Sequence, residues 1–502
     1  MRSRKALINT IAGLSYELVA VICGFILPRL ILMGFGSAYN GVTSSITQFL
    51  GYVTLMKAGI GGVTKAALYK PLADKDTKAI SAVVNATDRF LKRVATIFVV
   101  SLVVFACIFP YFVRENFEWF FTFTLVLILG ISTFAQYFFG LTYQLVLYSD
   151  QRQCVVSIIH IITTILNTLL AAILIKTGAT IHIVKLGSAV VFALNPFIVN
   201  IYTKYKYKID KTVAPNNDAI KDRWDCFGLQ VANFANANTD LFILTVFTNV
   251  YEVSVYTVYH MVTSGIRQIL NTFVNGMGAA FGNMFAKKET KIIYQNMLLY
   301  EELVFAMANF LFSVTLVMIV SFAQLYTEGI RDVDYVRYSF AYILVIAILF
   351  TVYRIPYQSI VEAVGHFKQT RNGAFFEAAL NIIVSLILVN YCGLVGVAIG
   401  TLCAGVFRTF QYGIYVSKFV VPRSIWILIK RIILSAVTFA LVIFISSLFD
   451  FTRPSNYLIW VLQSIAVCVV SAIVTISVEL LFYRNDLKLM LLKIRGALIR
   501  KK

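Results

Sequence analysis

The stretch FILPRLILMGFGSAYNG, residues 25–41, places a proline and an arginine inside a run that otherwise has the composition of a lipid-facing helix. The residues on either side, LVAVI at 18–22 and LILM at 30–33, are wholly apolar. Pro28 removes a backbone donor from the helix, and an arginine at the centre of a membrane helix costs at least about 2.5–3.5 kcal/mol. A charge kept at Arg29 against that cost predicts a helix that borders a polar interior as well as lipid.

The composition of the whole chain indicates a membrane protein with many spans. Of its 502 residues, 59% are hydrophobic and only 14% are charged, whereas soluble domains average about 45–50% apolar and about 25% charged residues. The long continuous apolar runs exclude a β-barrel, whose strands alternate. The net charge of +20 is interpreted as the positive-inside signature rather than as nucleic-acid binding. The seven cysteines form no CxxC motif and predict no disulfides.

Fourteen long apolar runs predict fourteen membrane helices, because about 20 apolar residues of helix cross the hydrocarbon core. The predicted fold is therefore an all-α polytopic membrane protein. The approximate limits of the runs are 7–33, 41–66, 90–113, 118–147, 153–175, 181–202, 226–248, 252–283, 299–325, 334–362, 372–391, 393–416, 425–449 and 456–482.

The distribution of basic residues fixes the predicted orientation. With the N-terminus inside, most Lys and Arg fall in cytoplasmic segments, above all in a predicted loop at 65–93, in the 203–225 segment and in the tail after residue 483. The predicted outer loops hold only Arg114, Lys176, Arg331, Arg337 and Arg453. Because cytoplasmic loops carry the excess of positive charge, both termini are predicted to be cytoplasmic.

Two pairs of segments indicate that the chain contains a parallel internal repeat. GIGGVTKAALYK at 59–70 resembles GMGAAFGNMFAKK at 276–288, and YQLVLYSDQR at 143–152 resembles YQSIVEAVGHFK at 357–368. Chance similarity between apolar helices is the alternative, but the segments recur in the same order. Each half then has six spans in the same orientation, as in parallel transporter repeats. The predicted domains are an N-lobe at 1–202, a cytoplasmic linker at 203–225, a C-lobe at 226–416 and two further helices with a basic tail at 417–502.

Charged and polar side chains within the predicted spans mark the candidate site. The buried cations are Arg29, Lys57, Arg267 and Arg354. Polar residues on helix faces that would line a cavity are Gln48, Tyr52, Gln230, Asn233, His260, Asn271 and Gln358. A single Asn or Gln in a span more often holds helices together, but several central cations exceed what packing requires. The pattern favours a hydrated cavity with positive charge.

A cavity with fixed positive charge suits an anionic ligand, and the planar fork of arginine suits phosphate. Three acidic residues, Glu17, Asp240 and Glu362, are candidates for coupling to Na⁺ or H⁺. The sequence contains no GxxxxGK[ST], HExxH or GxSxG motif and no long outer loop that could hold a catalytic site. We therefore predict transport rather than catalysis, with no cofactor, no metal and no nucleic-acid partner.

The N-terminal part of the chain resembles the signature of Wzx-type polysaccharide flippases. The similarity lies in FILPRLILMGFGSAYNGVTSSITQFLGYVTLMKAGIGGVTKAALYKPLADKD, residues 25–76, through its LPR, AYNG and GIGG elements. These flippases share a superfamily with the MATE drug exporters and the MurJ lipid II flippases. The architecture of two six-helix lobes plus two helices extends the resemblance over the whole chain.

The resemblance implies two lobes around a central cationic cavity in a bacterial cytoplasmic membrane. It implies a cargo of undecaprenyl-diphosphate-linked oligosaccharide, contact with membrane lipid and a polysaccharide polymerase as a partner. Arg29 and Arg267 are similar in placement to arginines of the family. Lys57 is a departure, because relatives often have an acid there, and this puts in doubt any ion coupling that used such an acid.

Three functions remain open on the sequence. The first is a flippase that works by alternating access, with lipid II as an alternative cargo. The second is an ion-coupled drug antiporter of the MATE type, which predicts an acidic cavity and conflicts with the surplus of buried cations. The third is a membrane scaffold for polysaccharide enzymes, in which the buried arginines would affect stability alone.

Overall fold

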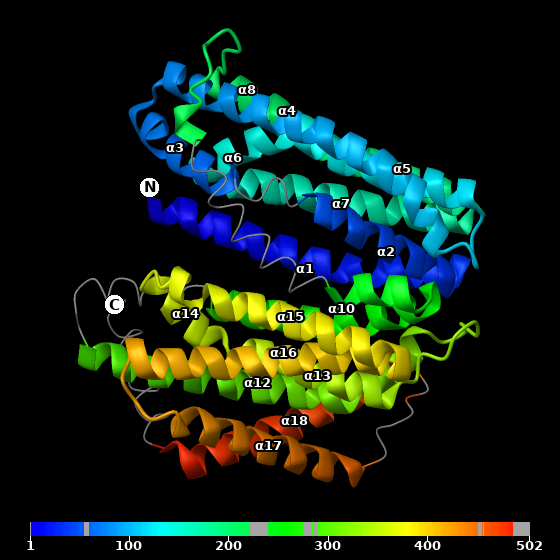
Figure 1. Cartoon of the computed structure of the whole chain (residues 1–502), viewed down its shortest axis with the longest axis vertical. Helices are drawn as coiled ribbons and strands as arrows, with labels where there is room; N and C mark the ends of the chain where they lie inside the picture. The colour runs from blue at the N-terminus through cyan, green and yellow to red at the C-terminus, as the bar shows by residue number, and fades with distance from the viewer. Residues whose placement is uncertain are drawn as a thin grey trace. The chain divides into compact units, whose positions relative to one another are not determined.

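The computed structural model describes residues 2–54, 60–220, 239–274, 284, 290–449, 454 and 456–484. Within these ranges all regular secondary structure is helical (Figure 1). The chain divides by its contacts into two compact units: unit 1 is Met1–Ser254 with Gly329–Val333, and unit 2 is Val255–Glu328 with Asp334–Lys502. The lobe boundaries predicted from the repeat, at 1–202, 203–225 and 226–416, stay a prediction.

Unit 1 is a helical bundle in which α1 packs against α7, α7 against α8, and α8 against α5. An aromatic cluster fills one end of it: Tyr39 meets the rings of Phe117 and Phe121 at 5.0 and 5.8 Å. Its helices are α1 (Arg2–Phe35), α2 (Ser37–Thr54), α3 (Ile60–Asp74), α4 (Thr77–Ile108), η2 (Phe109–Phe112), α5 (Trp119–Ala135), the π-helix η3 (Gln136–Gly140), α6 (Leu141–Ser149), α7 (Gln153–Lys176), α8 (Ile181–Tyr207) and η4 (Asp218–Ile220).

Unit 2 is a second bundle, in which α15 packs against α16, α16 against α13, and α13 against α12. The C-terminal pair α17 and α18, labelled in Figure 1, packs on α12. The helices are α10 (Val250–Val274), which starts in unit 1, α12 (Thr290–Tyr326), α13 (Tyr338–Tyr353), α14 (Ile355–Ala363), α15 (Phe367–Cys392), α16 (Leu394–Tyr415), η5 (Val416–Val420), α17 (Trp426–Ser447) and α18 (Tyr457–Phe482).

Eleven helices in the described ranges are long and apolar enough to cross a membrane, and they match eleven of the predicted spans. Their exposed side chains are largely Ile, Leu, Val and Phe, which suits contact with lipid. The remaining predicted spans, 41–66, 226–248 and 252–283, are the polar-striped ones. Parts of all three lie outside the described residues, and the stripes lower the mean hydropathy of the rest.

The internal repeat is visible in the way two spans are interrupted. The span from Trp119 to Ser149 changes from α5 to α6 through the π-helix η3. The span from Tyr338 to Ala363 changes from α13 to α14 at Arg354, next to Pro356. Proline lacks the backbone donor that would continue the hydrogen-bond ladder, which accounts for the second interruption.

The helix that follows each interruption ends in the same way. The backbone N–H of Arg152 donates to the carbonyl of Leu147 at 2.8 Å, and that of His366 donates to the carbonyl of Val361 at 3.1 Å. Both bonds close the six-residue Schellman turn. The residue before each donor is left-handed, with φ of 55° at Gln151 and 74° at Gly365. Each of these positions in unit 1 has its equivalent 214 residues later, which is the shift that the sequence repeat predicts.

One local expectation is corrected. The predicted loop at 65–93 is helical, because α3 continues to Asp74 and α4 starts at Thr77. The turn between them is stabilised by Asp76, whose carboxylate accepts from the backbone N–H groups of Lys78 and Ala79 at 3.0 Å each. The basic residues of this segment therefore lie on helical extensions rather than on a loop. Pro28 lies within the continuous helix α1.

Candidate functional site

The interruption between α13 and α14 places an arginine inside unit 2. Arg354 is the residue between the two helices, and its Nη1 donates to Oε1 of Glu377 on α15 at 2.5 Å. The side chains of Arg354 and Glu377 are only 15% and 9% exposed. A buried carboxylate thus neutralises an arginine in the interior of an apolar bundle.

A second arginine holds the same carboxylate from α16. Nε of Arg408 lies 3.4 Å from Oε2 of Glu377. The other nitrogens of Arg408 donate to the carbonyl of Thr370 at 3.0 Å, to Gln411 at 2.7 Å and to the hydroxyl of Tyr412 at 2.9 Å. The Arg408 side chain is thereby fixed from several directions. It does not snorkel toward the membrane surface, because its partners are in the interior.

Arg267 of α10 adds a third positive charge. It is half-buried and interacts electrostatically with Arg354 and with Glu377. We call Arg267, Arg354, Glu377 and Arg408 the arginine cluster. Three guanidinium groups around one carboxylate give it two formal positive charges in excess. Such a group favours an anion with several oxygen acceptors.

A different group of charges joins the C-terminal helices to unit 2. Arg423 forms a two-pronged ion pair with Glu301 of α12, and Arg431 of α17 pairs with Glu302. The four residues, which we call the α12–α17 ion cluster, are almost fully buried and balance to zero charge. Burial on its own lowers the pKa of Arg423, but the charge and hydrogen bonds of Glu301 and Tyr357 together raise this pKa above its ordinary value. A buried group whose charges pair with one another and sum to zero indicates a structural role.

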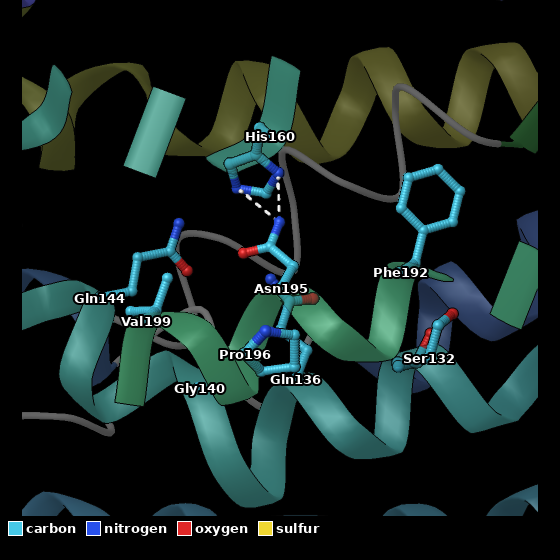
Figure 2. Close-up of a pocket in the computed structure, with 10 residues that line it drawn as sticks. Ser132, Gln136, Gly140, Gln144, His160, Phe192, Asn195, Pro196 and Val199 are labelled. Carbon is cyan, nitrogen blue, oxygen red and sulfur yellow. Dashed lines mark hydrogen bonds between the residues drawn. The ribbon is translucent and has the colours of Figure 1, made fainter. Parts of the chain in front are cut away.

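Unit 1 contains a polar pocket of about 190 Å³ between α5, η3, α6, α7 and α8. Figure 2 shows His160 facing Asn195, whose Nδ2 lies 2.7 Å from Nδ1 of the imidazole. The ring of Tyr16 on α1 packs against His160 with 5.3 Å between centroids. The side chains that line the pocket with hydrogen-bonding groups are Ser132, Thr133, Gln136, Gln144, His160 and Asn195. The pocket suits water or a neutral polar group, and π-helices such as η3 occur often at functional sites.

The structure brings together some of the residues predicted from the sequence. His260 lies within electrostatic range of Arg267 on the same helix, and its ring stacks on Tyr256 at 5.3 Å. Gln358 donates to Glu362 at 2.8 Å. Glu362 is exposed, and Arg354 pairs with Glu377 rather than with Glu362.

Other predicted residues lie elsewhere or outside the described ranges. Arg29, Glu17 and Gln48 are half-buried in unit 1, where Asp240 is buried, and each of these four has interaction partners. Asn271 is half-buried on α10. Tyr52 belongs to α2, but its side chain is not among those that the structure describes. Lys57, Gln230 and Asn233 lie outside the described residues.

Sequence reasoning missed Glu377, Arg408 and the polar pocket. Glu377 lies inside the predicted span 372–391, so a count of acids within spans, alongside the count of bases, would have found it. The pocket residues come from three different spans. Asn195 directly before Pro196 was the available signal, because a polar residue and a proline interrupt an apolar run there.

No family model and no curated protein matches the sequence. Solved structures do match. An inward-facing multidrug resistance MATE family transporter of the MOP superfamily has a TM-score of 0.65 at 15% identity, over 82% of this chain and 98% of that one. The lipid II flippase MurJ, in an inward closed conformation, has a TM-score of 0.71 at 16% identity, over 95% of this chain and 99% of that one.

A third similar structure is a MOP superfamily transporter from Pyrococcus furiosus, described by the reverse polarity of its binding pocket. Its TM-score is 0.57 at 14% identity, over 82% of this chain and 96% of that one. At these identities the likeness establishes the fold. The chain has the fold of MOP superfamily transporters, as an all-helical multi-pass membrane protein.

Proposed function

We propose that the protein is a flippase that moves an undecaprenyl-diphosphate-linked oligosaccharide across the bacterial cytoplasmic membrane by alternating access, for polysaccharide biosynthesis. The observation that carries this proposal is the arginine cluster. Two of its guanidinium groups pair with one carboxylate among the membrane helices of unit 2, and Arg267 adds a third positive charge within electrostatic range. The excess positive charge would bind the diphosphate of the cargo.

The extent of the structural likeness supports the flippase over the drug exporters. MurJ is similar over 95% of this chain, whereas the MATE transporter, itself matched almost completely, is similar over 82%. A drug antiporter for cations would also need excess negative charge, and the arginine cluster has the opposite sign. The Wzx-like sequence at 25–76 then favours a polysaccharide repeat unit over lipid II as the cargo.

In this proposal the predicted residues have three roles. Those that bind the diphosphate are Arg29, Lys57, Arg267 and Arg354. Those that line the path of the sugar are Gln48, Tyr52, Gln230, Asn233, His260, Asn271 and Gln358. Those that couple transport to Na⁺ or H⁺ are Glu17, Asp240 and Glu362. Both termini are cytoplasmic, and the polymerase machinery receives the product.

The test is a surface-glycan assay in cells that lack the gene. Complementation with Arg267→Ala or Arg354→Ala should give at least about tenfold less surface glycan than the wild type, which corresponds to about 1.4 kcal/mol in the transport barrier. Arg371→Ala is the matched control, because Arg371 is an exposed arginine on α15. Immunoblotting of the membrane fraction verifies equal protein levels.

Normal glycan in all three variants at normal protein levels would remove the phosphate-binding role of the cluster. Loss of glycan together with loss of protein would instead indicate that the arginines stabilise the fold, as the scaffold hypothesis predicts. Accumulation of lipid-linked oligosaccharide on the cytoplasmic side should accompany the loss of surface glycan in the first two variants.

A further inference from the structure

We infer that Glu377 is a built-in competitor for the anion: it occupies Arg354 when no cargo is bound, gives way to the phosphate, and returns to help release it. The inference rests on the proposed function, since it concerns the same arginine cluster. A carboxylate, rather than an arginine, then controls how tightly the cargo is bound.

The two arginines that hold Glu377 differ in their freedom to bind anything else. Arg408 is 4% exposed and donates to Thr370, Gln411 and Tyr412. Its guanidinium also stacks on the ring of Tyr412 at 4.1 Å. An incoming anion would have to break several of these interactions, so Arg408 is a fixed part of the site.

Arg354 is placed differently. It lies at the junction between α13 and α14, where its backbone N–H donates to Phe350 at 3.3 Å and its carbonyl accepts from Gln358 at 2.9 Å, so its freedom lies in the side chain. The side chain of Arg354 is 15% exposed, against 5% for that of Arg408. Arg354 is bound to the cluster through its hydrogen bond to Glu377, whereas Arg408 also donates to Thr370, Gln411 and Tyr412. Arg354 is therefore the arginine that can change partners.

The exchange leaves neither Arg354 nor Glu377 without an oppositely charged partner. A buried arginine without an anion is strongly destabilising, so the empty site needs a carboxylate on Arg354. A phosphate group accepts the same parallel hydrogen bonds as a carboxylate and can replace it directly. The displaced carboxylate still has Arg408, whose Nε lies 3.4 Å from Oε2 of Glu377.

The carboxylate has two effects on a bound phosphate. It competes for Arg354, and it repels the phosphate through their like charges. Removal of the Glu377 charge leaves three arginines without an internal anion, so the phosphate should bind more tightly and leave more slowly. A carrier must release its cargo, and transport should fall although binding improves.

The alternative is that Glu377 simply ties α15 to α13 and α16. That role predicts that neutralising Glu377 weakens both the fold and the binding of any anion. The two interpretations thus differ in the sign of the change in affinity. Affinity and export, measured on the same variants, separate them.

The test uses the purified full-length protein in lipid nanodiscs, with geranyl diphosphate and inorganic pyrophosphate as probes in isothermal titration calorimetry. Glu377→Gln should bind the probes about tenfold more tightly than the wild type, a change of about 1.4 kcal/mol, and should export less surface glycan in cells. Arg354→Ala should bind at least about tenfold more weakly. Glu328→Gln is the matched control, because it neutralises an exposed glutamate of unit 2.

Unchanged or weaker binding by Glu377→Gln, with normal binding by the wild type, would overturn the inference and leave the proposed function standing. Equal binding by the wild type and Arg354→Ala, or none by either, would remove the anion site itself and with it the support for the proposed function. If Glu377→Gln does not fold, Glu377→Asp replaces it, because its carboxylate is one methylene shorter and competes less well for Arg354. Tighter binding by that variant supports the inference, and unchanged or weaker binding overturns it.

Discussion

At the scale of single residues, Asp332 stabilises the start of α2 from a distant part of the sequence. Its carboxylate accepts from the backbone N–H and from the hydroxyl of Ser37, both at 2.6 Å. Ser37 is the first residue of α2, and Gly36 before it has a φ of 90°, which glycine adopts without strain. Asp332 thus acts as an N-cap supplied by the segment Gly329–Val333, which belongs to unit 1.

We predict that Asp332→Ala lowers the stability of the protein. Loss of an N-cap costs about 0.5–2 kcal/mol, and the negative charge at the positive end of the helix is lost as well. The melting temperature in detergent, measured by size-exclusion chromatography after heating, should fall for Asp332→Ala and stay unchanged for Glu328→Ala, an exposed residue of the preceding turn. Equal melting temperatures would show that the cap does not contribute to stability.

At the scale of helices, the close approach of η3 and α8 depends on a glycine. A Cβ built at Gly140 would lie 2.3 Å from Cβ and 2.7 Å from Cα of Pro196. Pro196 lies within α8 and is buried, so neither the ring nor its backbone can give way easily. The two segments therefore meet backbone against backbone beside the polar pocket.

Gly140→Ala should accordingly destabilise the protein by about 1–3 kcal/mol, the range for overpacked cores. Gly13→Ala is the control, because Gly13 lies in α1 and a methyl group added there would have nothing within 4 Å outside its own helix turn. Alanine there should be neutral or stabilising, since it favours helix over glycine. The folded yield and the melting temperature of the two variants provide the comparison, and equal losses would contradict the packing argument.

The α12–α17 ion cluster determines how the last two helices attach to unit 2. We predict that Arg431→Ala costs about 3–5 kcal/mol, because it leaves the buried carboxylate of Glu302 without its partner. The double variant Glu302→Gln, Arg431→Gln should recover much of that loss. Protease sensitivity of the segment between α16 and α17 would report on detachment of the C-terminal pair.

Lys430→Ala is the matched control for this cluster, since Lys430 is the exposed neighbour of Arg431 and lies over the ring of Tyr483 at 5.0 Å. Its loss should change the melting temperature little. A double variant as unstable as Arg431→Ala alone would mean that the charges act independently rather than as a pair.

At the scale of the whole molecule, the orientation in the membrane is a prediction from the basic residues. In a chain whose seven cysteines are replaced, Lys208→Cys after α8 should react with a membrane-impermeant maleimide only when the cytoplasmic side is opened. Lys176→Cys at the end of α7 should react in intact cells. Both lysines are exposed at helix ends, so accessibility differs only by the side of the membrane, and the reverse pattern would invert the topology.

Much of the fold could be predicted from the sequence, because a membrane helix must be apolar along most of its length and satisfies its own backbone groups. That requirement can be recognised in each short stretch of sequence by itself. The similarity between residues 143–152 and 357–368 can likewise be recognised from the two short stretches alone. The partner of Arg354 was not predictable in this way. Glu377 is 23 residues away, and only the packing of α16 against both α15 and α13 brings it within reach. The polar pocket depends on the packing of helices from three spans in the same manner.

The α12–α17 ion cluster also has a consequence for biogenesis. Glu301 emerges from the ribosome 122 residues before Arg423, so α12 enters the membrane while its two acids still lack their arginines. Burial of unpaired carboxylates is unfavourable, and the nascent bundle should remain open at α12 until α17 is inserted. A chain truncated before residue 423 would expose that defect to membrane quality control, and we expect its half-life in pulse–chase labelling to be much shorter than that of the complete chain.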